Sequence, residues 1–186
     1  YKPDIVHAHF GLSGLLAVFQ KKTPVIITFH GSDAAIPIIR LFSKIAATFS
    51  RFNIFVSSKI QLKIGLNKRF AIIPCGINLD IFQPVEMITA RKKLNLDSNK
   101  PLILFASGFD NYVKNSPLAF SAVKKIDQTI EIIELKNKSR EEVNLLLNAC
   151  DLLLLTSFSE GSPQIIKEAM ACNCPIVATD VGDIRE

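Results

Sequence analysis

The stretch 156–183, TSFSEGSPQIIKEAMACNCPIVATDVGD, decides how the rest of this chain is interpreted. Its apolar residues recur at helical spacing, which predicts a helix with Ser162 as N-cap and Pro163 as its first residue. A helix start beneath a glycine-containing loop offers backbone N–H groups and a positive dipole end to a phosphate. Glu160 lies in this loop and Glu168 on the second helical turn. The stretch therefore predicts a site for a ligand with both phosphate and hydroxyl groups, such as a sugar nucleotide.

The whole chain alternates strand and helix patterns, which is typical of parallel sheets built from βαβ units. Strands are predicted at residues 4–8, 24–30, 53–56, 70–73, 102–106, 129–135, 151–155 and 175–178. Helices are predicted at residues 12–22, 36–51, 57–66, 85–95, 116–127, 139–149 and from 162 onward. Ser139 and Glu142 predict a capping box at the start of the helix at 139–149. Prolines and a glycine mark residues 78–84 and their surroundings as a connector, so the sequence predicts two α/β units, 1–83 and 84–186.

Ligands of open parallel sheets bind at the carboxyl ends of the strands. The loops at those ends span residues 30–33, 108–115, 156–162 and 179–183, and they come from both halves, which predicts a site between two domains. Lys114 is a candidate to neutralise a diphosphate leaving group. His30 is a candidate donor to a sugar hydroxyl, the alternative being a strand-terminal histidine bonded to backbone. His7 and His9 are interpreted as structural or supporting residues.

Composition narrows the class of protein. The 186 residues are 48% hydrophobic, yet no apolar run reaches the roughly 18 residues that a membrane-spanning helix needs. The four cysteines lack metal-ligand spacing, and we interpret them as buried thiols of a cytoplasmic protein. No Asp-x-Asp motif is present, so neither a metal site nor an obligatory metal is predicted. Aromatic residues are not interleaved with a basic patch, so no nucleic-acid partner is expected.

Charge is distributed unevenly along the chain. Residues 1–83 hold ten Lys and Arg against three Asp, a net of +7, and residues 84–186 hold twelve against fourteen acids, a net of −2. The simple interpretation is a solvated basic surface, and the sharper one is contact with an anionic acceptor or with the inner face of an anionic membrane. Arg40, Lys44 and Arg51 share one helical face, which is either the solvated edge of a sheet-packed helix or part of an interfacial helix.

The pair Glu160 and Glu168, with seven residues between them, resembles the signature of the retaining glycosyltransferases of family 4, which have the GT-B fold of two Rossmann-like domains. His-Gly-Ser-Asp at 30–33 and Pro-Cys-Gly-Ile-Asn at 74–78 support the resemblance. It covers essentially the whole chain and implies an α/β GT-B fold with both domains truncated. Residues 1–83 would then be the later part of the acceptor-side domain, and residues 84–186 the first part of the donor-binding domain.

The resemblance also implies roles for individual residues. The donor-binding set that it implies is Gly108, Lys114, Glu160, Gly161, Ser162, Pro163 and Glu168. Glu160 would contact the donor sugar, Glu168 the ribose, and His30 the region of the reacting sugar; His30 and Glu160 are the catalytic candidates. Phe109 stands where the family has arginine, so one phosphate-binding charge is missing.

The implied activity is a retaining, metal-independent transfer of a sugar from a UDP- or GDP-linked donor to the hydroxyl of an acceptor glycan or lipid-linked sugar. This chemistry is typical of cell-surface polysaccharide and glycolipid synthesis. One alternative is a non-catalytic nucleotide-sugar binding module, which the Phe109 departure favours. Another is a GT-B-type nucleotide-sugar epimerase, although that class lacks this glutamate spacing followed by Ala-Met-Ala. The donor base, the sugar and the acceptor stay open.

Overall fold

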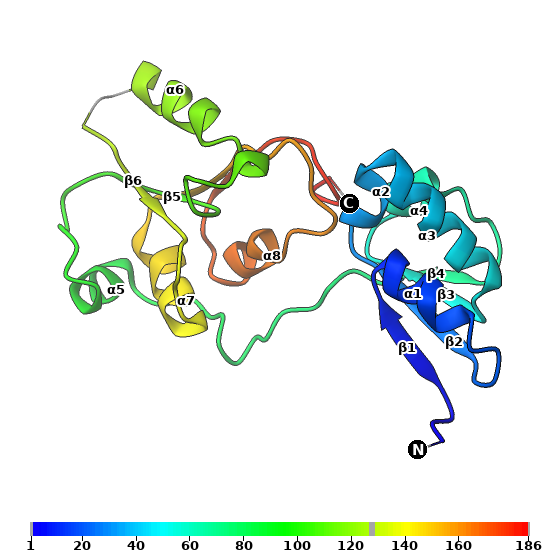
Figure 1. Cartoon of the computed structure of the whole chain (residues 1–186). Helices are drawn as coiled ribbons and strands as arrows, with labels where there is room; N and C mark the ends of the chain where they lie inside the picture. The colour runs from blue at the N-terminus through cyan, green and yellow to red at the C-terminus, as the bar shows by residue number, and fades with distance from the viewer. Residues whose placement is uncertain (1, 127–128, 186) are drawn as a thin grey trace. The chain divides into compact units, whose positions relative to one another are not determined.

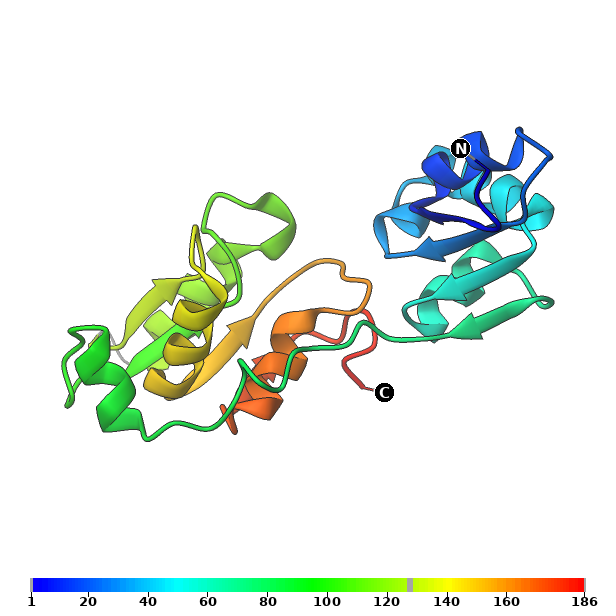
Figure 2. The ribbon, with the colours of Figure 1, turned by 90° about the horizontal axis from the view of Figure 1, so that it is seen from below.

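The computed structural model describes residues 2–126 and 129–185, which divide into two compact units. The first unit contains residues 2–75, 159–163 and 181–185, and the second contains the described residues of 76–158 and 164–180. Each unit has one four-stranded sheet (Figure 1, Figure 2). The predicted α/β class with two parallel sheets is confirmed. The chain first passes from the first unit to the second between residues 75 and 76. The division into 1–83 and 84–186 stays a prediction.

The first unit has the strand order β1-β2-β3-β4, with every pair parallel. Its strands are β1 (Val6–His9), β2 (Val25–Phe29), β3 (Phe52–Phe55) and β4 (Phe70–Ile72). Its helices are α1 (Gly11–Val18), α2 (Ser32–Ala35), α3 (Pro37–Phe49) and α4 (Ser58–Ile64). Each crossover moves the same way along the sheet and such crossovers are right-handed, so these helices cover one face of the sheet (Figure 1).

Small residues bring the helices of the first unit close to one another and to the sheet. Ile27 and Phe29 point from β2 into the core beneath the helices and are fully buried. A Cβ atom on Gly11 would lie 1.9 Å from the hydroxyl oxygen of Ser43, and one on Gly14 would lie 2.6 Å from Ile27 Cδ1. Alpha-helix α1 can therefore pack tightly against α3 and β2 only because these two positions lack side chains.

The second unit has the strand order β6-β5-β7-β8. Its strands are β5 (Leu102–Phe105), β6 (Glu131–Glu134), β7 (Leu152–Leu155) and β8 (Ile176–Ala178). Its helices are α5 (Met87–Lys93), the 3₁₀ helix η1 (Tyr112–Lys114), α6 (Ser116–Ile126), α7 (Arg140–Ala149) and α8 (Gln164–Ala171). The connections leave β5 in one direction to β6 and return past it to β7, which puts α6 on one face and α7 with α8 on the other. The carboxyl ends of β5 and β7 thus form the switch point at which such sheets bind ligands.

Several predicted details differ from the structure. Residues 31–33 were expected to be a loop, but α2 begins at Ser32. The helix predicted from Ser162 begins at Gln164, so Ser162 is not its N-cap and Pro163 is not its first residue. The Ser162 hydroxyl donates to Asp183 Oδ2 at 2.6 Å, a partner that the sequence pattern did not predict. The predicted capping box of Ser139 and Glu142 at the start of α7 is confirmed. Residue 127, the predicted end of the helix from 116, lies outside the described residues.

The cysteines are free thiols, as the sequence predicts. Cys150, Cys172 and Cys174 are buried, and Cys75 is half-buried. Burial raises the pKa of Cys150 to about 12, so this thiol stays protonated at neutral pH. The interpretation as buried thiols therefore holds for three of the four.

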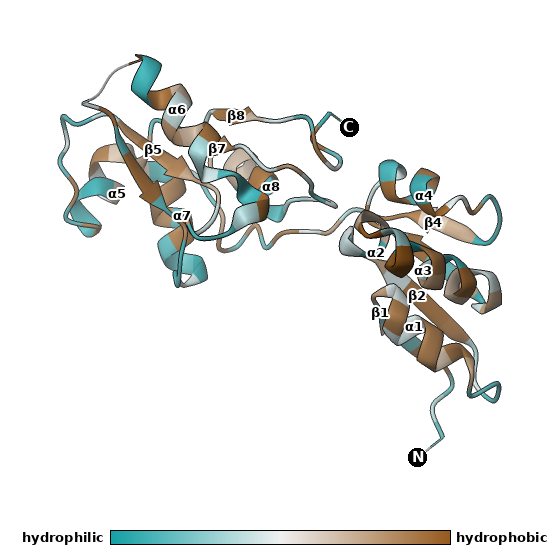
Figure 3. Cartoon of the chain, turned by 45° about the horizontal axis from the view of Figure 1, so that its top comes forward, coloured by the Kyte–Doolittle hydropathy of each residue, from teal (hydrophilic) through white to brown (hydrophobic). Residues whose placement is uncertain are grey.

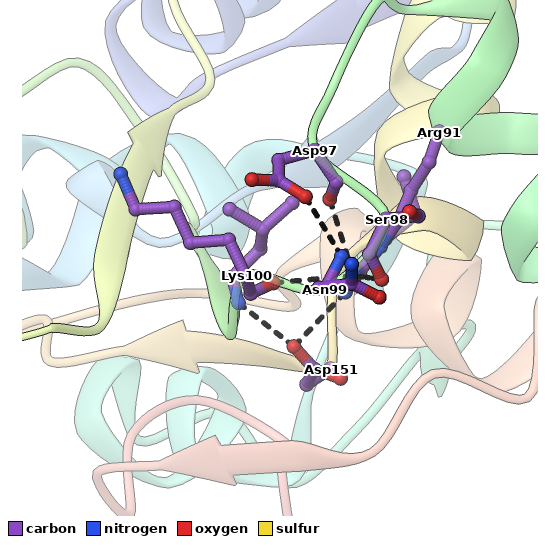
Figure 4. Close-up of polar contacts among 8 residues, drawn as sticks. Arg91, Asp97, Ser98, Asn99, Lys100 and Asp151 are labelled. Carbon is purple, nitrogen blue, oxygen red and sulfur yellow. Dashed lines mark hydrogen bonds and ion pairs between the residues drawn. The ribbon is translucent and has the colours of Figure 1, made fainter.

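The buried guanidinium of Arg91 holds the second unit together at the start of its strands (Figure 4). Its Nε donates to the carbonyl oxygen of Ala149 at 2.7 Å, and its Nη1 donates to that of Ser98 at 2.8 Å. Its Nη2 lies 3.1 Å from Asp151 Oδ2, an atom that also accepts from the backbone N–H of Leu102 at 2.7 Å. One side chain thus joins α5 to the segments that lead into β5 and β7.

Replacing Arg91 by alanine is expected to lower the free energy of unfolding by about 3–5 kcal/mol, because it leaves buried acceptors and one carboxylate without their donor. Urea denaturation followed by circular dichroism measures this loss. The matched control is Lys92→Ala on the same helix, an exposed position where we expect a change within about 0.5 kcal/mol. Equal, small losses in the two variants would show that Arg91 does not hold the unit.

Candidate functional site

Three loops of the second unit are tied together at the carboxyl ends of β5, β7 and β8. The Thr156 hydroxyl donates to the carbonyl oxygen of Lys114 at 2.9 Å and to that of Asn115 at 3.0 Å. The Thr179 hydroxyl donates to the carbonyl oxygen of Ser157 at 2.8 Å. The segment around Lys114, the segment after β7 and the segment after β8 therefore form one connected platform at the switch point of the sheet.

The loop after β5 is held by Glu134, the last residue of β6, and by Lys136, which follows that strand. The backbone N–H of Phe109 donates to Glu134 Oε2 at 2.7 Å. Lys136 Nζ lies 2.7 Å from Asp110 Oδ2, a pair that lowers the pKa of the Asp110 carboxyl mainly through this hydrogen bond. A Cβ atom on Gly108 would lie 2.7 Å from Asp110 Oδ1, so a side chain at Gly108 would displace the Asp110 carboxylate.

Phe109, which stands where the resembled family has arginine, packs into the hydrophobic cluster beneath α6. Its ring centroid lies 5.4 Å from that of Phe105 and 4.9 Å from that of Phe120. A cavity of about 270 Å³ adjoins it, lined also by Tyr112 and Phe158. The position therefore contributes an apolar wall and no positive charge to the loop.

Glu168 is the most deeply buried acid of the second unit. It projects from α8, it is 1% exposed, and its Oε1 accepts from Arg140 Nη2 at 2.5 Å. Arg140 is half-exposed, and its guanidinium carbon also lies 4.6 Å from the ring centroid of Phe82. A buried carboxylate needs such a partner, because leaving the charge unpaired costs several kcal/mol.

Arg140 was not predicted as a site residue. It is the first residue of α7, directly behind the Ser139–Glu142 capping box that the sequence makes visible. Only the arrangement of α7 and α8 on the same face of the sheet brings it to Glu168. A sequence pattern could have given its helix position, but not its partner.

In the first unit, the buried Asp33 carboxylate ties the turn after β1 to the turn after β2. Its Oδ1 accepts from the backbone N–H of Gly11 at 2.5 Å, and its Oδ2 accepts from that of His30 at 2.6 Å. This arrangement sets His30 beside His9, whose Nδ1 lies 2.8 Å from His30 Nε2. Partial burial lowers the pKa of His30 below its ordinary value, and the neighbouring His9 lowers it further, against an opposing effect of Asp33.

The loop 160–163 belongs to the first unit. A Cβ atom on Gly161 would lie 1.9 Å from the carbonyl oxygen of His30, so only glycine fits there. The predicted site residues consequently fall into two groups. His30, Glu160, Gly161, Ser162 and Pro163 lie in the first unit, and Gly108, Lys114 and Glu168 lie in the second. That both groups form one site stays a prediction.

Within residues 2–126 and 129–185, no helix is long and apolar enough to cross a membrane. Within the same residues, no group of three or more His, Cys, Asp and Glu side chains is arranged to hold a metal ion.

Two parallel α/β units, with polar loops gathered at the carboxyl ends of their strands, define a protein of the GT-B fold. The chain superposes on sucrose-phosphate synthase from Thermosynechococcus elongatus with a TM-score of 0.83 at 19% identity, covering 98% of this chain and 57% of that one. It superposes on HepE of Anabaena, solved in complex with UDP, with a TM-score of 0.77 at 17% identity, covering 96% and 60%.

Residues 1–81 match the model of Glycosyltransferase Family 4, and residues 119–186 match that of Glycosyl transferases group 1. The chain belongs to these glycosyltransferases. It is 28% identical to TuaC of Bacillus subtilis, a glycosyltransferase named for teichuronic acid biosynthesis, over 98% of this chain and 54% of the relative. The chain thus spans about half the length of that relative.

Replacing Arg140 by glutamine is expected to lower the free energy of unfolding by about 1–3 kcal/mol, because Glu168 then keeps a buried charge without its cation. Chemical denaturation measures the effect. The matched control is Lys138→Gln, which breaks the exposed pair of Lys138 with Glu142 at 3.7 Å and should change stability by less than about 0.5 kcal/mol. A loss no larger than that of the control would contradict the importance of the pair.

Proton NMR titration should give His30 a pKa below its ordinary value of 6.5, and His9→Asn should raise that pKa because one source of repulsion is removed. Protonation is disfavoured in the folded chain, so the His30 contribution to stability is complete above pH 6.5 and is lost as the pH falls below it. If His9→Asn left the pKa unchanged or lowered it, the coupling of the two rings would be refuted.

Proposed function

We propose that the protein containing this chain is a retaining glycosyltransferase that moves a sugar from a nucleoside diphosphate donor to an acceptor hydroxyl. The observation that carries the proposal is the platform of loops after β5, β7 and β8, beside a helix with a buried, arginine-held glutamate. Membership of the glycosyltransferase families and the likeness to a fold neighbour solved with UDP support it.

The donor would be held by its nucleotide half in the second unit. The Glu168 carboxylate suits acceptance of hydrogen bonds from ribose hydroxyls, and Arg140 fixes its orientation. The diphosphate would lie toward the start of α8, where backbone N–H groups and the helix dipole favour an anion. Lys114 would add a point charge, from a loop whose backbone Thr156 holds in place.

The proposed reaction breaks the bond between the anomeric carbon and the diphosphate oxygen, and the electron pair leaves with the diphosphate. The acceptor oxygen forms its bond to the anomeric carbon on the same face, and its proton passes to the leaving phosphate. Lys114 and the helix dipole would stabilise the growing negative charge. Glu160 and His30 would contact the sugar. We propose no obligatory metal, since the sequence has no Asp-x-Asp motif.

For the acceptor, we propose a cell-surface glycan or a lipid-linked sugar, in line with the teichuronic acid name of the TuaC relative. A lipid-linked acceptor stays at the bilayer surface. The proposed location is therefore the cytoplasm at the inner face of the membrane, in agreement with the +7 net charge of residues 1–83.

A nucleotide-sugar binding module without transfer is the second candidate. The burial of Phe109 in the hydrophobic cluster favours it, because the loop then has one phosphate-binding charge fewer than the resembled family. Such a module would bind the donor and release no nucleoside diphosphate.

Isothermal titration of UDP, GDP and ADP into the intact protein tests the nucleotide site. We expect binding of at least one nucleotide, and a loss of about tenfold or more for Glu168→Ala and for Lys114→Ala, each of which removes an ionic hydrogen-bonding group. Glu141→Ala, an exposed acid on the first turn of α7, is the matched control and should bind normally. Binding that neither substitution weakens would refute the assigned site.

A transfer assay on the same preparations, with EDTA in the buffer, separates the two candidate functions. Release of nucleoside diphosphate from a bound sugar nucleotide, with the product in the donor's anomeric configuration, supports the transferase. Binding of the sugar nucleotide without release of nucleoside diphosphate, with every acceptor tried, supports the binding module. Activity that EDTA abolishes would refute the metal-free reaction.

A further inference from the structure

The outward face of α3 is apolar. Its large side chains recur at helical spacing along one face and are exposed to solvent, with Leu41 at 53% and Phe49 at 73%. Leu16 of the neighbouring α1 and Phe19, which directly follows that helix, are exposed as well. The hydropathy colouring shows α1 as largely hydrophobic (Figure 3). We name this set the outer ridge: Ile38, Leu41, Phe42, Ile45 and Phe49 of α3, with Leu16 of α1 and Phe19 directly after α1.

The face of α3 that packs inward is built from small residues. Ser43, Ala46 and Ala47 are fully buried, and Ser43 approaches α1 at Gly11. A surface helix of a globular protein normally does the reverse, with large apolar residues inward and polar ones outward. The arrangement keeps the helix bound to its sheet and leaves its larger apolar surface available to another partner.

A basic cavity adjoins the outer ridge. It has a volume of about 570 Å³, and its lining includes Lys21, Lys22, Arg51 and Arg69 as well as Phe49 of the ridge. Arg69 Nη2 also donates to the carbonyl oxygen of Thr48 at 3.1 Å. This cation therefore also satisfies a backbone carbonyl in the last turn of α3.

The sequence of the first unit offers few carboxylates to offset these cations. Between residues 5 and 79 the sequence contains one acidic residue, Asp33, and that residue is fully buried. Lys44 is exposed on α3 beside the ridge, on the flank of the apolar face. The surface thus combines a convex apolar strip with unopposed positive charge.

We propose that the outer ridge and the basic cavity dock the protein on the surface of an anionic lipid bilayer. The ridge lies at the boundary between headgroups and acyl chains, and lipid phosphates occupy the basic cavity. The docking involves the first unit alone and does not depend on sugar transfer.

Charge favours a bilayer over a second copy of the chain. A second copy would bring the same excess of Lys and Arg to the contact, whereas an anionic bilayer supplies the opposite charge. A further part of the same polypeptide has another place to pack, the sheet face opposite the helices. There Ile26, Phe52 and Ile54 are only half-buried.

The test uses the intact protein and co-sedimentation with phosphatidylcholine vesicles, prepared with and without phosphatidylglycerol. We expect binding only to the anionic vesicles, weakened by salt. The double variants Lys21→Gln/Lys22→Gln and Leu41→Ser/Ile45→Ser should each weaken binding by about tenfold or more while UDP binding persists. The matched control Lys92→Gln/Lys93→Gln removes two exposed charges of α5 and should bind normally. Vesicle binding that both surface variants retain would refute the proposal.

A fluorescent reporter gives a second readout, since the chain contains no tryptophan. In the difference spectrum of Phe49→Trp against the parent protein, emission should shift to the blue only when anionic vesicles are added, and brominated lipid should quench it. A blue-shifted emission without vesicles would mean that the rest of the polypeptide covers the ridge, which overturns the proposal. A dimer in analytical ultracentrifugation that Leu41→Ser/Ile45→Ser dissociates would also overturn it, in favour of a second copy.

Discussion

The first unit depends on the buried Asp33 carboxylate, which accepts hydrogen bonds from backbone N–H groups. An ionised carboxylate in a core costs several kcal/mol unless hydrogen bonds replace its water. Here the donors are the turns after β1 and β2, through Gly11 and His30. The same interaction that satisfies the charge therefore fixes the strand ends and the backbone that carries the candidate histidine. Loss of the acid would release both turns at once.

The second unit solves the corresponding problem at the opposite end of its sheet. Arg91 donates to backbone carbonyl oxygens and pairs with Asp151 where the strands begin. The candidate loops lie at the other, carboxyl ends of the strands. Those loops are joined by lighter contacts, such as the hydroxyl of Thr156 on the backbone of Lys114. The proposed ligand site thus rests on strands whose starting ends are held by a buried side chain with several partners, which favours a fixed geometry at the loops.

The sequence predicted the order and type of the elements because each depends on local patterns: apolar runs for β5 and β7, and a capping box for α7. The sequence did not predict contacts that depend on a residue distant along the chain. Ser162 has the right chemistry for an N-cap, yet its hydroxyl bonds to Asp183, twenty-one positions later. Glu168 was found by its motif, but Arg140, on another helix, was not. Local propensity cannot report whether a hydroxyl bonds to its own helix or to a residue distant in the sequence.

Helix α3 shows a deeper reason for such limits. Helical periodicity reveals that a helix has a large apolar face, but it does not say whether that face meets the protein core. In α3 the decision rests with small residues, because Ala46 and Ala47 can approach the sheet more closely than Leu41 or Phe49 could. Close packing through small side chains takes the inward face of α3, and the proposed bilayer would take the large apolar side chains. A helix with small residues on one face, large apolar residues on the other and cations at its flank is therefore best interpreted as facing two different environments.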